Sequence, residues 1–126
     1  MKNERCYLKC EICGNLLGFI NDSGIAPECC GQPMEVLEPN TVDAAQEKHV
    51  PAITREGDKV RVSVGSVAHP MTPEHLIEWI ALAQDNTTQR IALTPADKPE
   101  AVFCCQPGPV TVYACCNLHG LWVSEL

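Results

Sequence analysis

The alternation of apolar and polar residues predicts strands over most of the chain beyond residue 40. Three valines at alternate positions of the segment 60–64 are separated by Arg61 and Ser63, and side chains two residues apart lie on one face of a strand. The run 49–54 is also extended, and the turn residues 56–58 join it to the valine strand as a β-hairpin. We expect further short strands at 90–93, 101–105, 110–114 and 121–124.

The N-terminal part carries shorter apolar runs on either side of a pair of cysteines. These runs predict short strands, with a turn at 21–24, and they contain Tyr7, Leu8, Leu16, Leu17, Phe19 and Ile20. The segment Glu38-Pro39-Asn40 is typical of a domain boundary. We therefore predict a small domain over residues 1–37 and a larger domain over residues 38–126.

The segment Thr72–Ala83 fits neither the period of a strand nor that of a helix. Thr72 and Pro73 form a good helix start, because threonine caps helices and proline suits the first helical position. The residues that follow are rich in strand formers: Leu76, Ile77, Trp79, Ile80 and Leu82. From local propensity alone, we predict a helix in this segment.

The composition excludes several classes of function. The chain has 126 residues and a formal net charge of −7 without a cluster of lysines and arginines, so nucleic acid and anionic membranes are not expected partners. No apolar run reaches the ~18 residues of a membrane span, and the start lacks the apolar stretch of a secretory signal. We therefore expect a cytoplasmic protein. An anionic substrate would need a local positive charge.

Nine cysteines without a signal peptide indicate metal binding rather than a secreted disulfide framework. The first group is Cys10-x-x-Cys13 followed by the adjacent pair Cys29-Cys30, and four thiolates can hold one tetrahedral ion. This spacing leaves iron and zinc open. A metal would also stabilise a domain of under ~40 residues, which buries too little apolar surface to fold alone.

The second candidate group contains all the histidines of the chain, which are His49, His69, His75 and His119. Nearby prolines stiffen the backbone at His49 and His69, and Cys116 precedes His119 by three residues, so that both can reach one ion. Any single histidine would more often be a surface or core residue, and Cys116-x-x-His119 alone could be half of a zinc finger. Their joint occurrence in short, stiff loops favours a second metal site.

At these residues the sequence resembles desulfoferrodoxin, the two-iron class of superoxide reductase. Each motif is modest by itself, but five of them in the family's order over nearly the whole chain are highly specific. The matching segments are the two cysteine pairs, Glu47-Lys48-His49-Val50-Pro51, Gly65-Ser66-Val67-Ala68-His69-Pro70-Met71, His75 followed by Ile77-Glu78-Trp79-Ile80, and Cys116-Asn117-Leu118-His119-Gly120.

The resemblance implies a mostly β fold, with a desulforedoxin-like domain that holds a tetrathiolate iron and an immunoglobulin-like β-sandwich that holds a catalytic iron. It implies two iron ions per chain, one bound by Cys10, Cys13, Cys29 and Cys30 and one bound by His49, His69, His75, His119 and Cys116. It also implies a homodimer, a small electron donor such as rubredoxin, and a strand instead of a helix at 75–82.

The function implied is the one-electron reduction of superoxide to hydrogen peroxide at a non-haem ferrous site, which an external donor re-reduces. Five ligands favour iron because zinc prefers four, and the Cys116 thiolate would push electron density toward the metal. We expect Lys48 to attract superoxide and to order a proton-delivering water. By resemblance, Glu47 would occupy the open position of the oxidised iron.

Some cysteines depart from the family pattern, namely Cys6, Cys104, Cys105 and Cys115. Each is most simply a small buried hydrophobe, with a redox role as the alternative for the last three. The alternative for the whole chain is a non-catalytic electron-transfer protein of the rubredoxin or desulforedoxin type. Such a protein would need only the first cluster and would leave the histidines unexplained.

Overall fold

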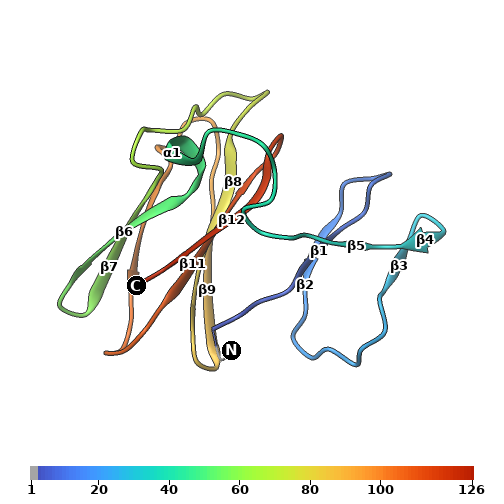
Figure 1. The fold of residues 1–126 in the computed structure, drawn as a ribbon, viewed down its shortest axis with the longest axis horizontal. Coiled ribbons are helices and arrows are strands. Elements are labelled where there is room, and N and C mark those ends of the chain that lie inside the picture. The colour runs from blue at the N-terminus through green and yellow to red at the C-terminus, as the bar shows by residue number, and fades with distance from the viewer. Residues whose placement is uncertain (1–2) are drawn as a thin grey trace. The chain divides into compact units, whose positions relative to one another are not determined.

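A computed structural model of the chain describes residues 3–126, in which a single four-residue helix accompanies strands (Figure 1). The chain divides into two units, one formed by residues 4–38 and the other by residues 39–126 together with Asn3. Residues 1 and 2, which the sequence-based division assigns to the first domain, lie outside the described residues. Within the described part of the chain, no helix is long and apolar enough to cross a membrane.

The unit formed by residues 4–38 contains a three-stranded antiparallel sheet and a short two-stranded ribbon. The sheet has the order β2-β1-β5, with β1 at Tyr7–Lys9, β2 at Leu16–Gly18 and β5 at Glu35–Val36. The ribbon pairs β3 (Glu28–Cys29) with β4 (Gln32–Pro33). Its fully packed core is small and consists of Leu8, Cys10 and Met34, with Cys6, Phe19 and Cys29 against them.

The second unit is a sandwich of two antiparallel sheets (Figure 1). One sheet has the order β10-β7-β6, formed by Glu100–Cys104, Lys59–Val64 and Pro51–Glu56. The other has the order β12-β11-β8-β9, formed by Gly120–Glu125, Thr111–Cys116, Ile77–Gln84 and Thr87–Ala92. The short helix α1, Gln46–His49, precedes β6. The mostly β fold with an immunoglobulin-like sandwich, which the family resemblance implies, is therefore confirmed.

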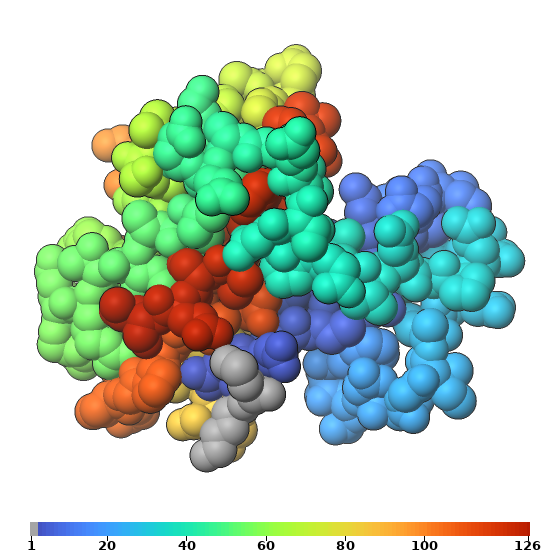
Figure 2. Space-filling model, viewed as in Figure 1, coloured from blue at the N-terminus to red at the C-terminus, as the bar shows by residue number. Residues whose placement is uncertain are grey.

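The core of the sandwich lies between the two sheets. Alternate residues of β7 and β11 supply it, because every second side chain of a strand points to the same face. The predicted valine strand is therefore confirmed, and its valines are fully buried. At one edge β12 lies next to β6, as the red and green segments of Figure 2 show, and the Ser124 hydroxyl donates a hydrogen bond of 2.6 Å to the Pro51 carbonyl.

The helix that local propensity predicts over Thr72–Ala83 is wrong. The structure places β8 at Ile77–Gln84, as the family resemblance implies, and all of its residues except Glu78 are buried. A strand that is covered on both faces shows no alternation, so its apolar run cannot be distinguished from a buried helix by period. The predicted extended run also begins too early, because His49 belongs to α1 and β6 starts at Pro51.

Candidate metal centres

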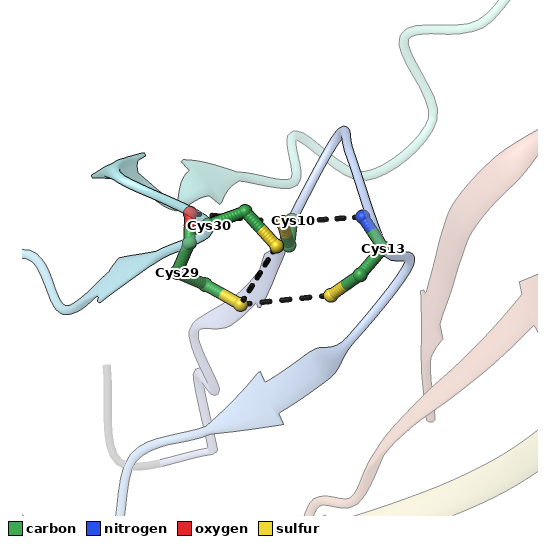
Figure 3. Close-up of side chains that lie close together, drawn as sticks. All are labelled: Cys10, Cys13, Cys29 and Cys30. Carbon is green, nitrogen blue, oxygen red and sulfur yellow. Dashed lines mark hydrogen bonds between the residues drawn. The ribbon is translucent and has the colours of Figure 1, made fainter.

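The four cysteines of the first group face one another within residues 4–38 (Figure 3). Cys10 directly follows β1 and Cys13 lies in the turn after it, whereas Cys29 ends β3 and Cys30 begins the turn to β4. Their sulfur atoms all lie within 4.8 Å of one another, and the Cys13 and Cys29 sulfurs are 3.5 Å apart. Two short turns thus bring four sulfur donors to one point.

The backbone of both turns is bent to suit this arrangement. Gly14 has a φ of +81°, and its N–H donates to the Cys10 carbonyl at 2.9 Å, while the Cys13 N–H points at the Cys10 sulfur at 3.4 Å. Cys30 itself has a φ of +53°, which is costly for a residue with a Cβ atom. This unusual conformation lets the neighbouring Cys29 and Cys30 side chains both turn toward the same point.

The electrostatics of the four thiols favour a bound cation. Hydrogen bonding from the Cys13 N–H lowers the pKa of Cys10 to about 6, so this thiol ionises readily. Hydrogen bonds with Cys13, Cys10 and Cys29 raise the pKa of Cys30 to about 12, because they favour its protonated form, and burial and the charge of Cys10 raise it further. Full ionisation therefore requires a positive charge among the sulfurs, and four thiolates suit iron or zinc.

The second group forms where strands of both sheets end. β6 begins where β7 ends, and β8 and β12 begin where β11 ends, so the connecting segments gather at one end of the sandwich, near α1 in Figure 1. The donor residues all lie at this end: His49 closes α1, His69 follows β7, His75 precedes β8, Cys116 closes β11 and His119 precedes β12. Antiparallel pairing thereby unites residues that are up to 70 positions apart.

An irregularity in the sheet occurs directly beside the thiol of this group. The register between β8 and β11 shifts, because Cys115 pairs with Trp79 while the next residue, Cys116, pairs with Ile77. Glu78 is the extra residue, so this is a β-bulge, a feature that redirects side chains next to functional sites. Cys116 keeps its place on the core side of the sheet, where it is 1% exposed.

The nitrogen and sulfur atoms of the second group approach closely. His49 Nε2 lies 3.1 Å from His119 Nδ1 and 3.2 Å from His69 Nε2, and the Cys116 sulfur lies 3.8 Å from His119 Nδ1. Ligand atoms of His49, His75, Cys116 and His119 all lie within 4.8 Å of one another. His69 lies outside that mutual set but adjoins it, with its ring centroid 4.6 Å from the ring of His75.

Hydrogen bonds from the ring fix two of these histidines. His49 Nδ1 donates to the Ala45 carbonyl and His69 Nδ1 donates to the Pro70 carbonyl, both at 2.7 Å. A protonated Nδ1 leaves the Nε2 lone pair free for a metal. His75 Nε2 is buried and has no hydrogen-bond partner in the described chain. Buried polar atoms are seldom left unpaired, so this nitrogen is suited to bind a metal.

Burial sets the protonation of this centre. It lowers the pKa of His69 to about 4, and it lowers the pKa of His75, to which the charges of His119, His49 and Lys48 add. These imidazoles are therefore neutral near pH 7, as metal ligands must be. Burial also raises the pKa of Cys116, so a cation is needed to hold it as a thiolate. Imidazoles with one thiolate fit iron.

The remaining predicted residues lie beside the second group. Glu47 and Lys48 belong to α1, and both side chains are exposed. The Glu47 carbonyl accepts hydrogen bonds from the Val67 N–H at 2.8 Å and from the Ser66 hydroxyl at 3.3 Å. Lys48 is close enough for its charge to be felt at His75.

The additional cysteines lie outside both groups, and all are free thiols. Cys115 is buried, and Cys105 packs against the core, as expected of small hydrophobic residues. Cys6 packs against the small core of the first unit. The prediction of a buried side chain is wrong for Cys104, which is exposed. Side chains alternate between the two faces of β10, and Cys104 lies on the outer face.

Two residues that touch the second group were missed by sequence reasoning. The Trp122 indole N–H donates to the His119 carbonyl at 3.0 Å, and its ring stacks on His49 with centroids 4.9 Å apart. Asn117 hydrogen-bonds to both neighbours of His75. A tryptophan three residues after a candidate ligand and an asparagine between two ligands were visible in the sequence, but nothing in the pattern predicted their contacts.

The fold and the two donor groups define a two-site metalloprotein with a four-cysteine unit and a histidine–cysteine centre in a β-sandwich. The sequence model of the family described as desulfoferrodoxin matches residues 41–125. The chain belongs to the desulfoferrodoxin family, and its two donor groups match the two iron sites of that family.

Individual relatives match either nearly the whole chain or about two thirds of it. The desulfoferrodoxin of Syntrophotalea carbinolica is 51% identical over 117 residues, which is 93% of each chain. The superoxide reductase of Pyrococcus abyssi is 42% identical over 99 residues, covering 64% of this chain and 86% of its own. The crystal structure of the superoxide reductase from Treponema pallidum matches with a TM-score of 0.79 and 36% identity, over 96% of this chain and 98% of that chain.

Proposed function

We propose that this protein is a superoxide reductase, which converts superoxide to hydrogen peroxide at the histidine–cysteine centre. The observation that carries the proposal is the convergence of histidine nitrogens and the Cys116 sulfur at one end of the sandwich. The similar proteins of Treponema pallidum and Pyrococcus abyssi are named superoxide reductases, which supports the same activity here.

The reaction consumes one electron and two protons for each superoxide and yields one hydrogen peroxide. Iron held by His49, His69, His75, His119 and Cys116 supplies the one-electron redox couple. The pKa values of His69 and His75 are lowered by burial, so these two imidazoles would hold the metal without adding charge, and the Cys116 thiolate would donate electron density to it. A small redox protein of the rubredoxin type replaces the electron.

Lys48 and Glu47 act from the exposed helix α1. Superoxide is an anion and the chain carries a net charge of −7, so a local positive charge is needed for attraction. The Lys48 ammonium provides this charge beside His49 and orders a water that delivers a proton. By resemblance to the family, Glu47 would be an additional ligand of the oxidised iron and would be released when the iron is reduced.

We further propose that the protein is a homodimer that works in the reducing cytoplasm. Large apolar side chains are exposed on the small unit, where a partner would cover them: Ile12, Leu17, Ile20, Ile25 and Val36. Nine free thiols are typical of a reducing compartment. Light scattering of the iron-loaded protein should give twice the mass of one chain, and a monomer would contradict the dimer.

The test of the proposed function is the yield of peroxide from anaerobically reduced protein with a defined electron supply. We expect one hydrogen peroxide for each superoxide consumed, without evolution of oxygen. Half that yield with matching oxygen would mean dismutation. No acceleration over the spontaneous reaction would favour a plain electron-transfer protein.

A further inference from the structure

The second metal centre depends on two loops that lie far apart in the sequence. One loop joins β11 to β12 and carries Cys116 and His119, and the other precedes β8 and carries His75. The distance between the Cys116 sulfur and the His75 ring is therefore set by whatever holds these loops together. Asn117 makes that connection.

Asn117 makes three hydrogen bonds to the loop of His75. Its Oδ1 accepts from the Leu76 N–H at 3.0 Å, its Nδ2 donates to the Glu74 carbonyl at 2.9 Å, and its own N–H donates to the Leu76 carbonyl at 3.2 Å. Asn117, which follows the candidate ligand Cys116, thus binds the residues on both sides of the candidate ligand His75. A carboxamide suits this task because it offers a donor and an acceptor at once.

The ring of His75 needs such support from its backbone. Unlike His49 and His69, whose Nδ1 atoms donate to carbonyl oxygens, His75 is held through main-chain contacts. Thr72 provides those contacts on one side, where its hydroxyl accepts from the His75 N–H at 3.0 Å. On the other side, Asn117 holds the main chain of the two neighbours of His75, Glu74 and Leu76.

We propose that Asn117 is a positioning residue that fixes His75 relative to Cys116 and so sets the affinity and the thiolate geometry of the histidine–cysteine centre. The inference rests on the proposed iron site, but it concerns metal binding and not turnover of superoxide. Loss of the side chain frees the 74–76 loop on one side, so His75 becomes a weaker ligand.

The test compares Asn117→Ala, which removes both side-chain hydrogen bonds, with Asn117→Asp, which keeps the acceptor for the Leu76 N–H and loses the donor. The reduced protein is mixed with a ferrous chelator, and aliquots are withdrawn and oxidised at intervals. The cysteine-to-iron charge-transfer band of each aliquot measures how much iron is still bound to the histidine–cysteine centre. Outer-sphere partners are typically worth 10- to 100-fold in metal affinity. We expect release at least ~10-fold faster for Asn117→Ala, a smaller effect for Asn117→Asp, and a shifted band in both.

Asn40→Ala is the matched control. Asn40 makes the same pair of side-chain bonds, to the N–H and carbonyl of Val123 at 2.9 and 3.1 Å, but it bonds to no ligand loop. We expect it to lower thermal stability with an unchanged band and unchanged release. Wild-type release and band position in Asn117→Ala would overturn the proposal, as would equal acceleration in Asn40→Ala. Neither result depends on superoxide reduction, which the peroxide yield tests separately.

Discussion

The Trp122 side chain touches two candidate ligands of the second centre in two different ways. Its indole N–H bonds to the His119 carbonyl, and its ring face lies on the His49 ring with an interplanar angle of 27°. It is only 1% exposed, so these contacts are shielded from water. At the scale of single residues, the Trp122 ring and the carbonyl oxygens of Ala45 and Pro70 fix the orientation of the His49 and His69 rings.

We predict that Trp122→Phe keeps the stacked ring but weakens the metal centre. The lost hydrogen bond should cost about 1 kcal/mol of folding free energy, and the smaller ring adds the cost of a cavity. Iron should also leave the second centre faster, because the His119 backbone is no longer held. Thermal unfolding and release to a chelator measure the two effects.

Trp79→Phe is the control for this change. Trp79 is also nearly buried, but it pairs with Cys115 and so lies on the face of the sheet opposite to Cys116. It should lose stability without faster release of iron. If both variants release iron equally, the loss reflects general destabilisation and Trp122 has no special role.

We predict that Lys48→Ile slows the capture of superoxide and flattens its dependence on ionic strength. Electrostatic steering raises association rates by roughly 10- to 1,000-fold, so loss of one well-placed charge should cost about tenfold. The second-order rate constant at several salt concentrations, measured by pulse radiolysis, checks this expectation.

Lys59→Ile removes an equal charge from the opposite end of the β6–β7 hairpin. Lys59 pairs with Glu56, five residues along β6 from Pro51, which is about 17 Å at the rise of a strand. That exceeds the ~8–10 Å over which salt screens charges. Capture should therefore be nearly unchanged, and equal slowing in both variants would mean that net charge matters and position does not.

At the scale of elements, the alternation of apolar and polar residues predicted the strands that have one polar face. It did not predict the strand that is buried on both faces. The alternating valines from 60 to 64 were assigned correctly, whereas β8 is buried on both sides and was taken for a helix from propensity alone. The resemblance corrected that error. The short helix α1 was not predicted, since four residues carry too little pattern to reveal a helix.

The candidate ligands could be proposed from the sequence because cysteine and histidine are the side chains that most often bind transition metals. The contacts that aim them could not be predicted, since Ala45 and Pro70 act through carbonyl oxygens that every residue has. Asn117 was part of a quoted motif, but its partners at 74 and 76 are brought near only by the pairing of β8 with β11.

Gly65 shows how one element constrains another. A Cβ atom at this position would lie 2.6 Å from the Glu47 carbonyl oxygen and 2.9 Å from that of Val50. Both atoms belong to the backbone, so no side chain can turn aside. Lys48 and His49 lie between Glu47 and Val50 in the chain. The loop after β7 therefore packs closely against the segment that carries the candidate ligand His49.

We predict that Gly65→Ala displaces α1, costs roughly 1–3 kcal/mol of stability, and weakens iron binding at the second centre. Gly57→Ala is the control, because Gly57 has a φ of +63° and open space around it in the hairpin turn. That control should lose stability through backbone strain and keep its iron. Intact binding in Gly65→Ala would show that the backbone yields elsewhere.

At the scale of the whole molecule, each unit supplies all the candidate ligands of its own donor group. The four cysteines lie within residues 4–38, and the histidines with Cys116 lie within residues 39–126. The core of the smaller unit is built around Leu8, Cys10 and Met34, so one of its three residues is itself a candidate ligand. Such a unit has little hydrophobic stabilisation apart from its metal.

We therefore predict that Cys13→Ser releases the metal of the small unit and unfolds it, while the sandwich keeps its iron. Metal binding supplies folding free energy where the core is small, whereas the two sheets of the sandwich bury a continuous core of their own. Limited proteolysis of the full chain should then cut within residues 4–38 and leave 39–126 intact, with the charge-transfer band of the second centre retained. Cys104→Ser, at an exposed thiol outside both centres, should resist cleavage like the wild type. Loss of the second band in Cys13→Ser would mean that the two centres are coupled in folding.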